Sequence, residues 1–149
     1  MEEADFMFSG TYQNSIDPKG RVIVPAKFRD GLGHDFVLTK GQDGCLYLYP
    51  RDEWTKFRDK LETIPLSSKA GRAFKRFFFA NAVESEMDKQ GRLGIPQNLR
   101  EYAMIEKELV TIGVDERIEI WAKQVWEDYN ASQELDGENI ERAMEGLGI

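Results

Sequence analysis

The stretch "IDPKGRVIVP", residues 16–25, returns as "MDKQGRLGIP", residues 87–96, and this duplication decides how the rest of the chain is interpreted. An offset of 71 residues superposes the aspartate, glycine, arginine and proline of the two copies: Asp17 on Asp88, Gly20 on Gly91, Arg21 on Arg92, and Pro25 on Pro96. Repetition at a fixed period is the signature of a duplicated structural unit. The chain therefore carries an Asp-x-x-x-Arg turn twice.

The similarity continues beyond the two turns at an offset of 72 residues. There "DFVLTKGQDGCLYLYPRDEW" (35–54) lies over "KELVTIGVDERIEIWAKQVW" (107–126), which superposes Thr39 on Thr111 and Trp54 on Trp126. Each unit spans about 45 residues, from roughly 15 to 61 and from 86 to 133. The chain therefore consists mainly of two homologous units.

Each unit reads as a turn, a short strand, a helical turn, a hairpin and a helix. Asp and Gly favour the turn, and glycine permits a positive φ there. Val22 and Val24 alternate with Arg21, so the valines should face a core and the arginine should point outward. Pro25 and Pro96 suit the first turn of a short helix. The hairpins should bury four residues: Leu46, Leu48, Ile118 and Ile120.

The remaining segments have helical patterns. Residues 50–61 and 122–133 are amphipathic, and Ser67 or Ser68 is a suitable N-cap for a basic linker helix that follows. A last amphipathic helix is expected from Asp136 to Gly148. A lone hairpin is marginal in water, so two units should pair around a pseudo-two-fold axis. We predict a mainly β fold with α-helices: one interleaved β-barrel with peripheral helices.

The composition fits a soluble protein of about one domain. The chain has 149 residues and a formal net charge of −7, but residues 127–149 alone hold seven acids and one base. Residues 6–126 hold 17 acids and 19 bases, so an acidic overall charge hides a slightly basic body. No apolar stretch approaches the roughly 20 residues of a membrane span, and no secretory leader precedes the repeats. We expect a cytoplasmic protein.

Enzymatic chemistry finds little support in the residue types. His34 is the only histidine and Cys45 the only cysteine, so no cofactor, metal cluster or Cys-His pair is expected. Cys45 aligns with Arg117, which indicates a partly exposed strand position. Asp17 and Asp88 could imitate a carboxylate pair, but the arginine after each would keep both ionised. We predict no enzyme and no small-molecule ligand.

Three segments resemble the MraZ family of bacterial transcriptional regulators: "MFSGTYQNSIDPKGRVIVPAKFR", "RFFFANAVESEMDKQGR" and "IGVDERIEIWAKQVWE". The resemblance covers about residues 6–133. It implies tandem AbrB-like repeats at 6–61 and 84–133, joined by a linker helix at 62–83 and followed by an acidic tail at 134–149. It further implies a ring-shaped homo-oligomer that binds short direct repeats in promoter DNA. Such a protein would repress its own division and cell wall gene cluster and associate with the nucleoid.

The resemblance also assigns the DNA contacts to the two repeated turns. By position these are Asp17 with Arg21 and Asp88 with Arg92; Lys19 and Lys89 are added as DNA-binding candidates, although they do not align with each other. Arginine can bond two acceptors on guanine or a phosphate, and an aspartate can hold its guanidinium in place. An ion pair that only staples the turn remains an alternative. So does a different function, an AbrB-like scaffold or partner-protein module without DNA binding.

Overall fold

The structure is a computed structural model that describes residues 7–132 and 136–149. Residue 6 and residue 133, which bound the predicted repeats, lie outside the described residues, as do the acidic leader and the start of the predicted tail at residue 134. The first unit begins with a strand that precedes the repeated turn. Its elements are β1 (Phe8–Ser15), β2 (Arg21–Ile23), α1 (Ala26–Leu32), β3 (Asp35–Lys40), a 3-10 turn (Gln42–Gly44), β4 (Leu46–Pro50), α2 (Arg51–Glu62) and the linker helix α3 (Lys69–Phe79).

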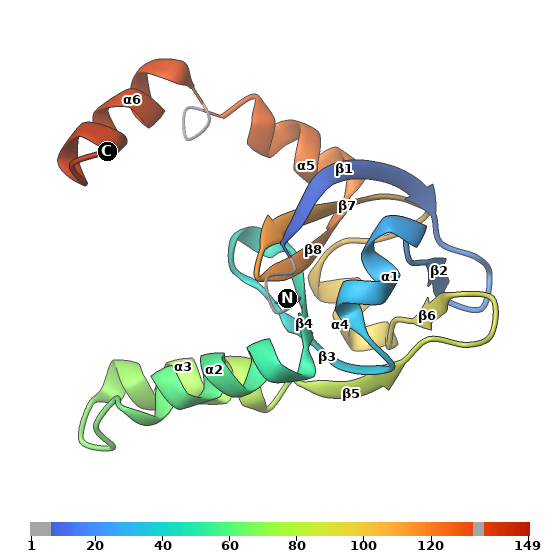
Figure 1. Cartoon of the computed structure of the whole chain (residues 1–149), viewed down its shortest axis with the longest axis horizontal. Coiled ribbons are helices and arrows are strands. Elements are labelled where there is room, and N and C mark those ends of the chain that lie inside the picture. Colours follow the sequence, from blue (N-terminus) through green and yellow to red (C-terminus); the bar gives the residue numbers. More distant parts are fainter. Residues whose placement is uncertain (1–6, 133–135) are drawn as a thin grey trace, which may run out of the picture.

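The second unit repeats this order with shorter helices. Its elements are β5 (Val83–Glu86), β6 (Arg92–Gly94), α4 (Gln97–Tyr102), β7 (Glu108–Asp115), β8 (Arg117–Ala122), α5 (Lys123–Asn130) and α6 (Gly137–Gly146). In Figure 1, α2 and α3 lie side by side and project from one end of the molecule, and α6 stands away from the body beyond α5.

The strands of the two units interleave, as expected, but they do not close a barrel. Six strands form one antiparallel sheet in the order β1-β7-β8-β4-β3-β5, and β2 pairs with β6 in a separate two-stranded ribbon. Each unit thus gives its first strand to the hairpin of the other unit. The prediction of a barrel is wrong because β2 and β6, three residues each, pair with one another and leave β1 and β5 as open edges.

A pseudo-two-fold axis relates the two units and passes through two pairs of strands. Val22 lies opposite Leu93 in the ribbon, and Tyr47 lies opposite Glu119 where β4 meets β8. At the second position the two equivalent residues, Tyr47 and Glu119, differ in polarity, which breaks the symmetry. Glu119 is buried, accepts a hydrogen bond from Trp121 Nε1 at 3.0 Å and pairs with Arg117 at 2.7 Å. The guanidinium of Arg117 lies 4.1 Å from the centre of the Tyr47 ring.

The sheet separates two apolar cores because alternate residues of each strand face opposite sides. One core lies between the sheet, the β2–β6 ribbon and helices α1 and α4; it holds Val22, Val24, Leu93 and Ile95, together with the four hairpin residues predicted to be buried. The other core lies under α2, α3 and α5 and holds Trp54, Phe78 and Trp121. The inward alternation of the two short strands is therefore confirmed.

One of the predicted helix starts is set by a side-chain cap. Ser68 is the N-cap of α3 and accepts a hydrogen bond from Gly71 N at 3.0 Å, as one of the two predicted caps. Pro25 and Pro96 stand one residue before α1 and α4, with extended ψ angles, rather than inside the first turn. The final helix is shorter than predicted, since α6 ends at Gly146.

Cys45 occupies a different environment from the one predicted. Its side chain is fully buried in the core beneath α2 and α3, so the prediction of a partly exposed position is wrong. Its Sγ donates to the carbonyl oxygen of Gln42 at 3.2 Å, and burial raises the pKa of the thiol well above its usual range. The alignment with Arg117 misled because that arginine reaches a partner carboxylate and an aromatic ring, whereas a thiol needs neither.

Among the described residues, no helix combines the length and apolar character that crossing a membrane requires.

Candidate nucleic-acid interface

The first repeated turn is closed by its aspartate. Asp17 N donates to Arg21 O at 2.8 Å, and Asp17 Oδ1 accepts from the backbone nitrogens of Lys19 at 2.9 Å and Arg21 at 2.8 Å. The other carboxylate oxygen, Oδ2, accepts from Arg21 Nε at 2.8 Å. Gly20 adopts φ +80°, a conformation that glycine tolerates at little cost. A single carboxylate therefore both closes the backbone turn and holds the guanidinium of Arg21 in place.

The second turn repeats this geometry. Asp88 accepts from Gln90 N at 2.9 Å, from Arg92 N at 2.8 Å and from Arg92 Nε at 2.7 Å. Gly91 has φ +77°. The structure thus brings each predicted Asp and Arg into an ion pair, which would also satisfy a purely structural role for the motif.

The two arginines differ at their outer ends. Arg92 Nη2 donates to Gln90 Oε1, whereas Lys19 occupies the corresponding place against Gln90 and cannot accept a hydrogen bond. Within the described part of the chain, the Nη atoms of Arg21 have no hydrogen-bond partner. Both Nη atoms of Arg21 can therefore donate to a ligand, while one Nη atom of Arg92 already donates to Gln90.

Hydrogen bonding keeps both aspartates charged. The backbone N–H of Arg21 is the main cause that lowers the pKa of Asp17, and the Arg21 guanidinium adds to it. The backbone N–H and guanidinium of Arg92 lower the pKa of Asp88 in the same way. Both carboxylates are consequently ionised at neutral pH and orient the arginines.

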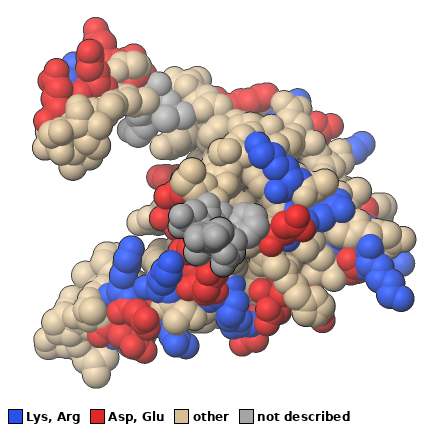
Figure 2. Space-filling model, in the orientation of Figure 1, with Lys and Arg blue, Asp and Glu red and all other residues tan. Residues whose placement is uncertain are grey.

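The β2–β6 ribbon carries both arginines on one face. Val22 and Leu93 point inward, so Arg21 and Arg92 on either side of that pair point outward. Both line an open depression of about 440 Å³ together with Asp88, Lys89 and Gly94. Figure 2 shows Lys and Arg side chains at the right-hand end of the molecule, where the two turns lie in Figure 1.

The predicted lysines occupy the tips of the turns. Lys19 and Lys89 are both exposed, but they stand at different positions, since Lys19 follows Asp17 by two residues and Lys89 follows Asp88 by one. Their side chains add positive charge beside each arginine. The two turns consequently have similar charge but different shape.

Arg29 and Arg100 brace the turns across the axis, a role that the sequence reasoning missed. Arg29 Nε donates to Val24 O, and Arg100 Nε donates to Ile95 O, each at 2.9 Å. The guanidinium of Arg29 lies against Gly91 of the other repeat; a Cβ there would stand only 2.5 Å from its Cζ. Arg100 packs against Gly20 in the same manner. In the sequence, this bracing role could have been found from the equal spacing of the two arginines from their turns.

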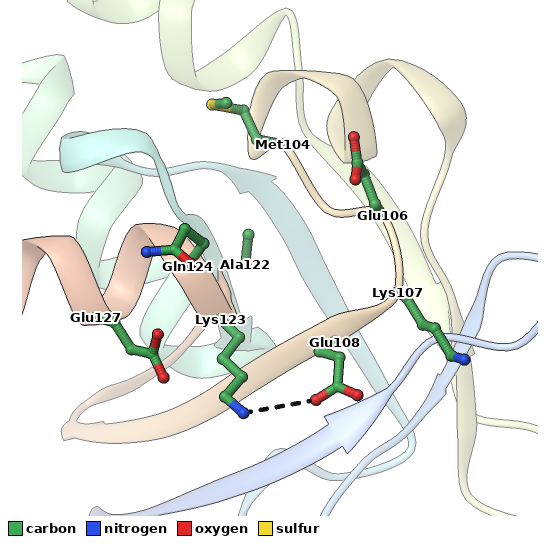
Figure 3. A pocket seen from close by; sticks show the side chains of 8 residues that line it. All are labelled: Met104, Glu106, Lys107, Glu108, Ala122, Lys123, Gln124 and Glu127. Atoms are coloured by element: carbon green, nitrogen blue, oxygen red, sulfur yellow. Dashed lines mark ion pairs between the residues drawn. The ribbon is translucent and has the colours of Figure 1, made fainter.

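A second depression lies away from the turns. It measures about 460 Å³ and is lined by Met104, Glu106, Lys107, Glu108, Ala122, Lys123, Gln124 and Glu127. Figure 3 shows Lys123 directed toward Glu108, and their charged atoms are 3.8 Å apart. Its acids and bases are mixed, which gives no field favouring an anion. The residues that the structure describes include no group of three or more potential metal ligands.

The sequence matches a family model twice. The family is described as "MraZ protein, putative antitoxin-like", and the matches cover residues 7–77 and 78–146. The boundary between the matches falls near the end of α3, so each match contains one Asp-x-x-x-Arg turn, one hairpin and the helices that follow.

Relatives named "Transcriptional regulator MraZ" match over nearly the whole chain. The protein of Clostridium beijerinckii is 59% identical over 143 residues, which cover 96% of this chain and 100% of that protein. Those of Caldanaerobacter subterraneus subsp. tengcongensis and Pelotomaculum thermopropionicum are each 54% identical over 143 residues, covering 96% of this chain and 100% and 99% of theirs. These names describe a non-enzymatic function, which confirms the prediction that the chain is not an enzyme. The chain belongs to the MraZ family.

Proposed function

We propose that this protein regulates transcription by binding promoter DNA through the outward face of the β2–β6 ribbon. The observation that carries the proposal is the pair of Asp-held arginines, Asp17 with Arg21 and Asp88 with Arg92, side by side on one exposed face. Arginine forks fit guanine edges in the major groove and phosphate oxygens equally well. Lys19 and Lys89 add phosphate contacts at the rim of this face.

Several copies of the chain bind together as a ring. The slightly basic body of a single copy offers few phosphate contacts, but linked copies raise the effective concentration of each contact for the next. Copies related by rotation in a ring present the same face in the same direction. Because Gln90 makes the two turns of each copy unequal, such a ring fits short direct repeats better than inverted ones.

The target is the promoter region of the division and cell wall gene cluster to which the chain's own gene belongs. Occupancy of repeats in a promoter excludes polymerase, so the chain acts there as a repressor. It works in the cytoplasm on the nucleoid. The names of the relatives support the regulation of transcription in this proposal.

A binding titration tests the proposal. Purified full-length protein is added to labelled DNA that carries the upstream region of its own gene, with one repeat or with all repeats, at several salt concentrations. We expect tight binding only to several repeats and a log–log salt slope of about −0.9 for each phosphate neutralised. Arg21→Ala/Arg92→Ala should lose on the order of 100-fold in affinity, since each bidentate base contact is worth about 1–3 kcal/mol.

Arg58→Ala is the matched control, because Arg58 is an exposed arginine on α2 rather than on the ribbon. It should bind like the unmodified protein. Normal binding by a correctly folded Arg21→Ala/Arg92→Ala variant would refute the assignment of the face. Failure of the unmodified protein to bind its own upstream DNA would favour the scaffold function instead.

A further inference from the structure

Helices α3 and α6 follow the hairpins of their units but differ in packing. In the first unit, α3 lies beside α2 and buries Phe78 against the sheet, where Thr39 Oγ1 donates to Phe78 O at 2.7 Å. In the second unit, α6 follows α5 at the corresponding place in the chain. Within the described residues, α6 buries none of its side chains, and Figure 1 shows it apart from the body. An amphipathic helix in this situation has an apolar stripe without a partner.

The apolar stripe of α6 is regular. Ile140, Met144 and Leu147 recur at spacings of four and three residues and are exposed, Leu147 at 75% of its surface. Glu138, Glu141 and Glu145 form an acidic row beside this stripe, with spacings of three and four. Figure 2 shows acidic side chains gathered on α6.

The outer side of α3 has the opposite charge. Lys69, Arg72, Lys75 and Arg76 are its only charged residues, and all are basic. Phe74 is 50% exposed and Leu66, just before the helix, is 74% exposed; with Ala70 and Ala73 they form an apolar stripe. Lys69, Arg72 and Arg76 run beside this stripe at spacings of three and four, the same spacings as the acids of α6.

We infer that α6 of one copy packs on the outer face of α3 of a second copy. The inference rests on the proposed ring, whose subunit contact it identifies. The apolar stripes would pack against one another, and the acidic row of α6 would face the basic row of α3 when the two helices run parallel. The contact joins two different surfaces, so each copy can take part in two contacts, and successive contacts form a ring where the rotation between copies closes.

The charges also indicate which partner covers the apolar stripe of α6. A basic polar face is typical of helices that lie on anionic membranes, whereas α6 carries three acids and one base between Gly137 and Gly146. An anionic membrane would therefore repel the acidic row of α6, which the basic row of α3 attracts. Phe74 of α3 and Leu66 just before it are too exposed for the interior of a single copy, which suits a surface that another copy covers.

Charge exchange between variants tests the contact and shows whether it joins two copies. Variant A is Lys69→Glu/Arg76→Glu on α3, and variant B is Glu138→Lys/Glu145→Lys on α6; each pair is seven residues apart. In a sample of either variant alone, the α3 of one copy and the α6 of the next copy then carry like charges. We expect light scattering to give the 17.2 kDa monomer for either variant alone, while the unmodified protein gives a multiple of that mass.

An equimolar mixture of A and B should assemble again, because every α3 then meets an α6 of opposite charge on a neighbouring copy. The chain with all four substitutions should assemble by itself. Met144→Ser, which keeps every charge, should weaken assembly through the apolar stripe alone. Lys27→Glu/Lys107→Glu, a reversal of two exposed lysines outside α3, should leave the mass unchanged.

Three outcomes overturn the inference. Variants A and B, shown to be folded by circular dichroism, could retain the mass of the unmodified protein. The mixture could fail while the fourfold variant assembles, which would place the contact within one chain. An unmodified protein that is monomeric would remove the ring itself, whereas loss of DNA binding with an intact ring would refute only the DNA-binding face.

Discussion

Val22 lies directly opposite Leu93 on the pseudo-two-fold axis, and this pairing places Arg21 and Arg92 on the same outward face. The ribbon is further closed by Val24 N donating to Gly91 O and Ile95 N donating to Gly20 O, each at 2.9 Å. Two turns that are 71 residues apart in sequence thereby become one surface.

Arg21→Ala should weaken DNA binding more than Arg92→Ala. Arg21 offers both Nη atoms, whereas Arg92 already donates one to Gln90 Oε1. We expect a loss of about tenfold or more for Arg21→Ala, the size of one good bidentate contact, and a smaller loss for Arg92→Ala. Fluorescence anisotropy on the same operator measures both. Equal losses would show that the Gln90 contact opens on binding.

Asp17→Asn should reduce affinity without changing its salt dependence. The amide can still accept the backbone N–H groups of Lys19 and Arg21 through Oδ1, but the charged partner of Arg21 Nε is lost. The arginine keeps its charge and loses its orientation. Titrations between about 50 and 200 mM salt should therefore give the unmodified slope, whereas Arg21→Ala should make the slope shallower by about one per lost phosphate contact. A shallower slope for Asp17→Asn would contradict the positioning role.

Gly91→Ala should destabilise the protein more than Gly44→Ala. Both glycines have positive φ, +77° and +81°, but a Cβ at Gly91 meets Arg29 Cζ at 2.5 Å, whereas nothing lies within 4 Å of a Cβ at Gly44. Gly44→Ala thus reports the cost of the backbone conformation alone, about 1–2 kcal/mol.

The difference should shrink when Gly91→Ala is combined with Arg29→Ala, because the clashing side chain is then absent. Urea unfolding of the two single variants and the double variant gives this coupling free energy. Additive effects would show that Arg29 does not pack on the second turn in solution.

Cys45 should make folding stability depend on alkaline pH. Burial raises the pKa of the native thiol, while in the unfolded chain the thiol ionises near its ordinary value of about 8.5. Above that pH the unfolded state has lost a proton that the native state keeps, so the free energy of unfolding falls by about 1.4 kcal/mol per pH unit. At about pH 7 and below, well under the pKa of the unfolded thiol, this contribution is constant.

Urea melts of the unmodified protein and of Cys45→Ala between about pH 7.5 and 9.5 measure the effect. The variant should lack the extra decline. The native thiol should also react slowly with a thiol reagent, at the rate at which the core opens. Fast, pH-dependent labelling would instead indicate an accessible thiol.

Local sequence patterns predicted the elements whose stability is local. The Asp-x-x-Gly-Arg turns are closed locally by their own aspartate and by a positive φ at glycine, and the structure has both. Ser68 caps α3 through a residue three positions away. Alternation correctly placed Val22 and Leu93 inside, because a strand that covers a core must alternate.

Elements that depend on distant partners were missed or misjudged. Strands β1 and β5 precede the repeated turns and were not expected, since their polar, half-exposed residues become strands by pairing with β7 and β3 of the other unit. The bracing by Arg29 and Arg100 depends on the glycine of the opposite turn. Cys45, which directly precedes β4, became buried because helices from two parts of the chain cover that position.

By itself the sequence determined that the chain is duplicated, that each copy has an aspartate-held arginine, and which residues face inward, because turn chemistry and strand alternation act over a few neighbouring residues. Only the tertiary structure decided that the units exchange their first strands, that the sheet stays open, and that the two arginines share one face. Those features depend on hydrogen bonds and packing between residues that are 45 to 107 positions apart, and no local pattern specifies which partner a strand will meet.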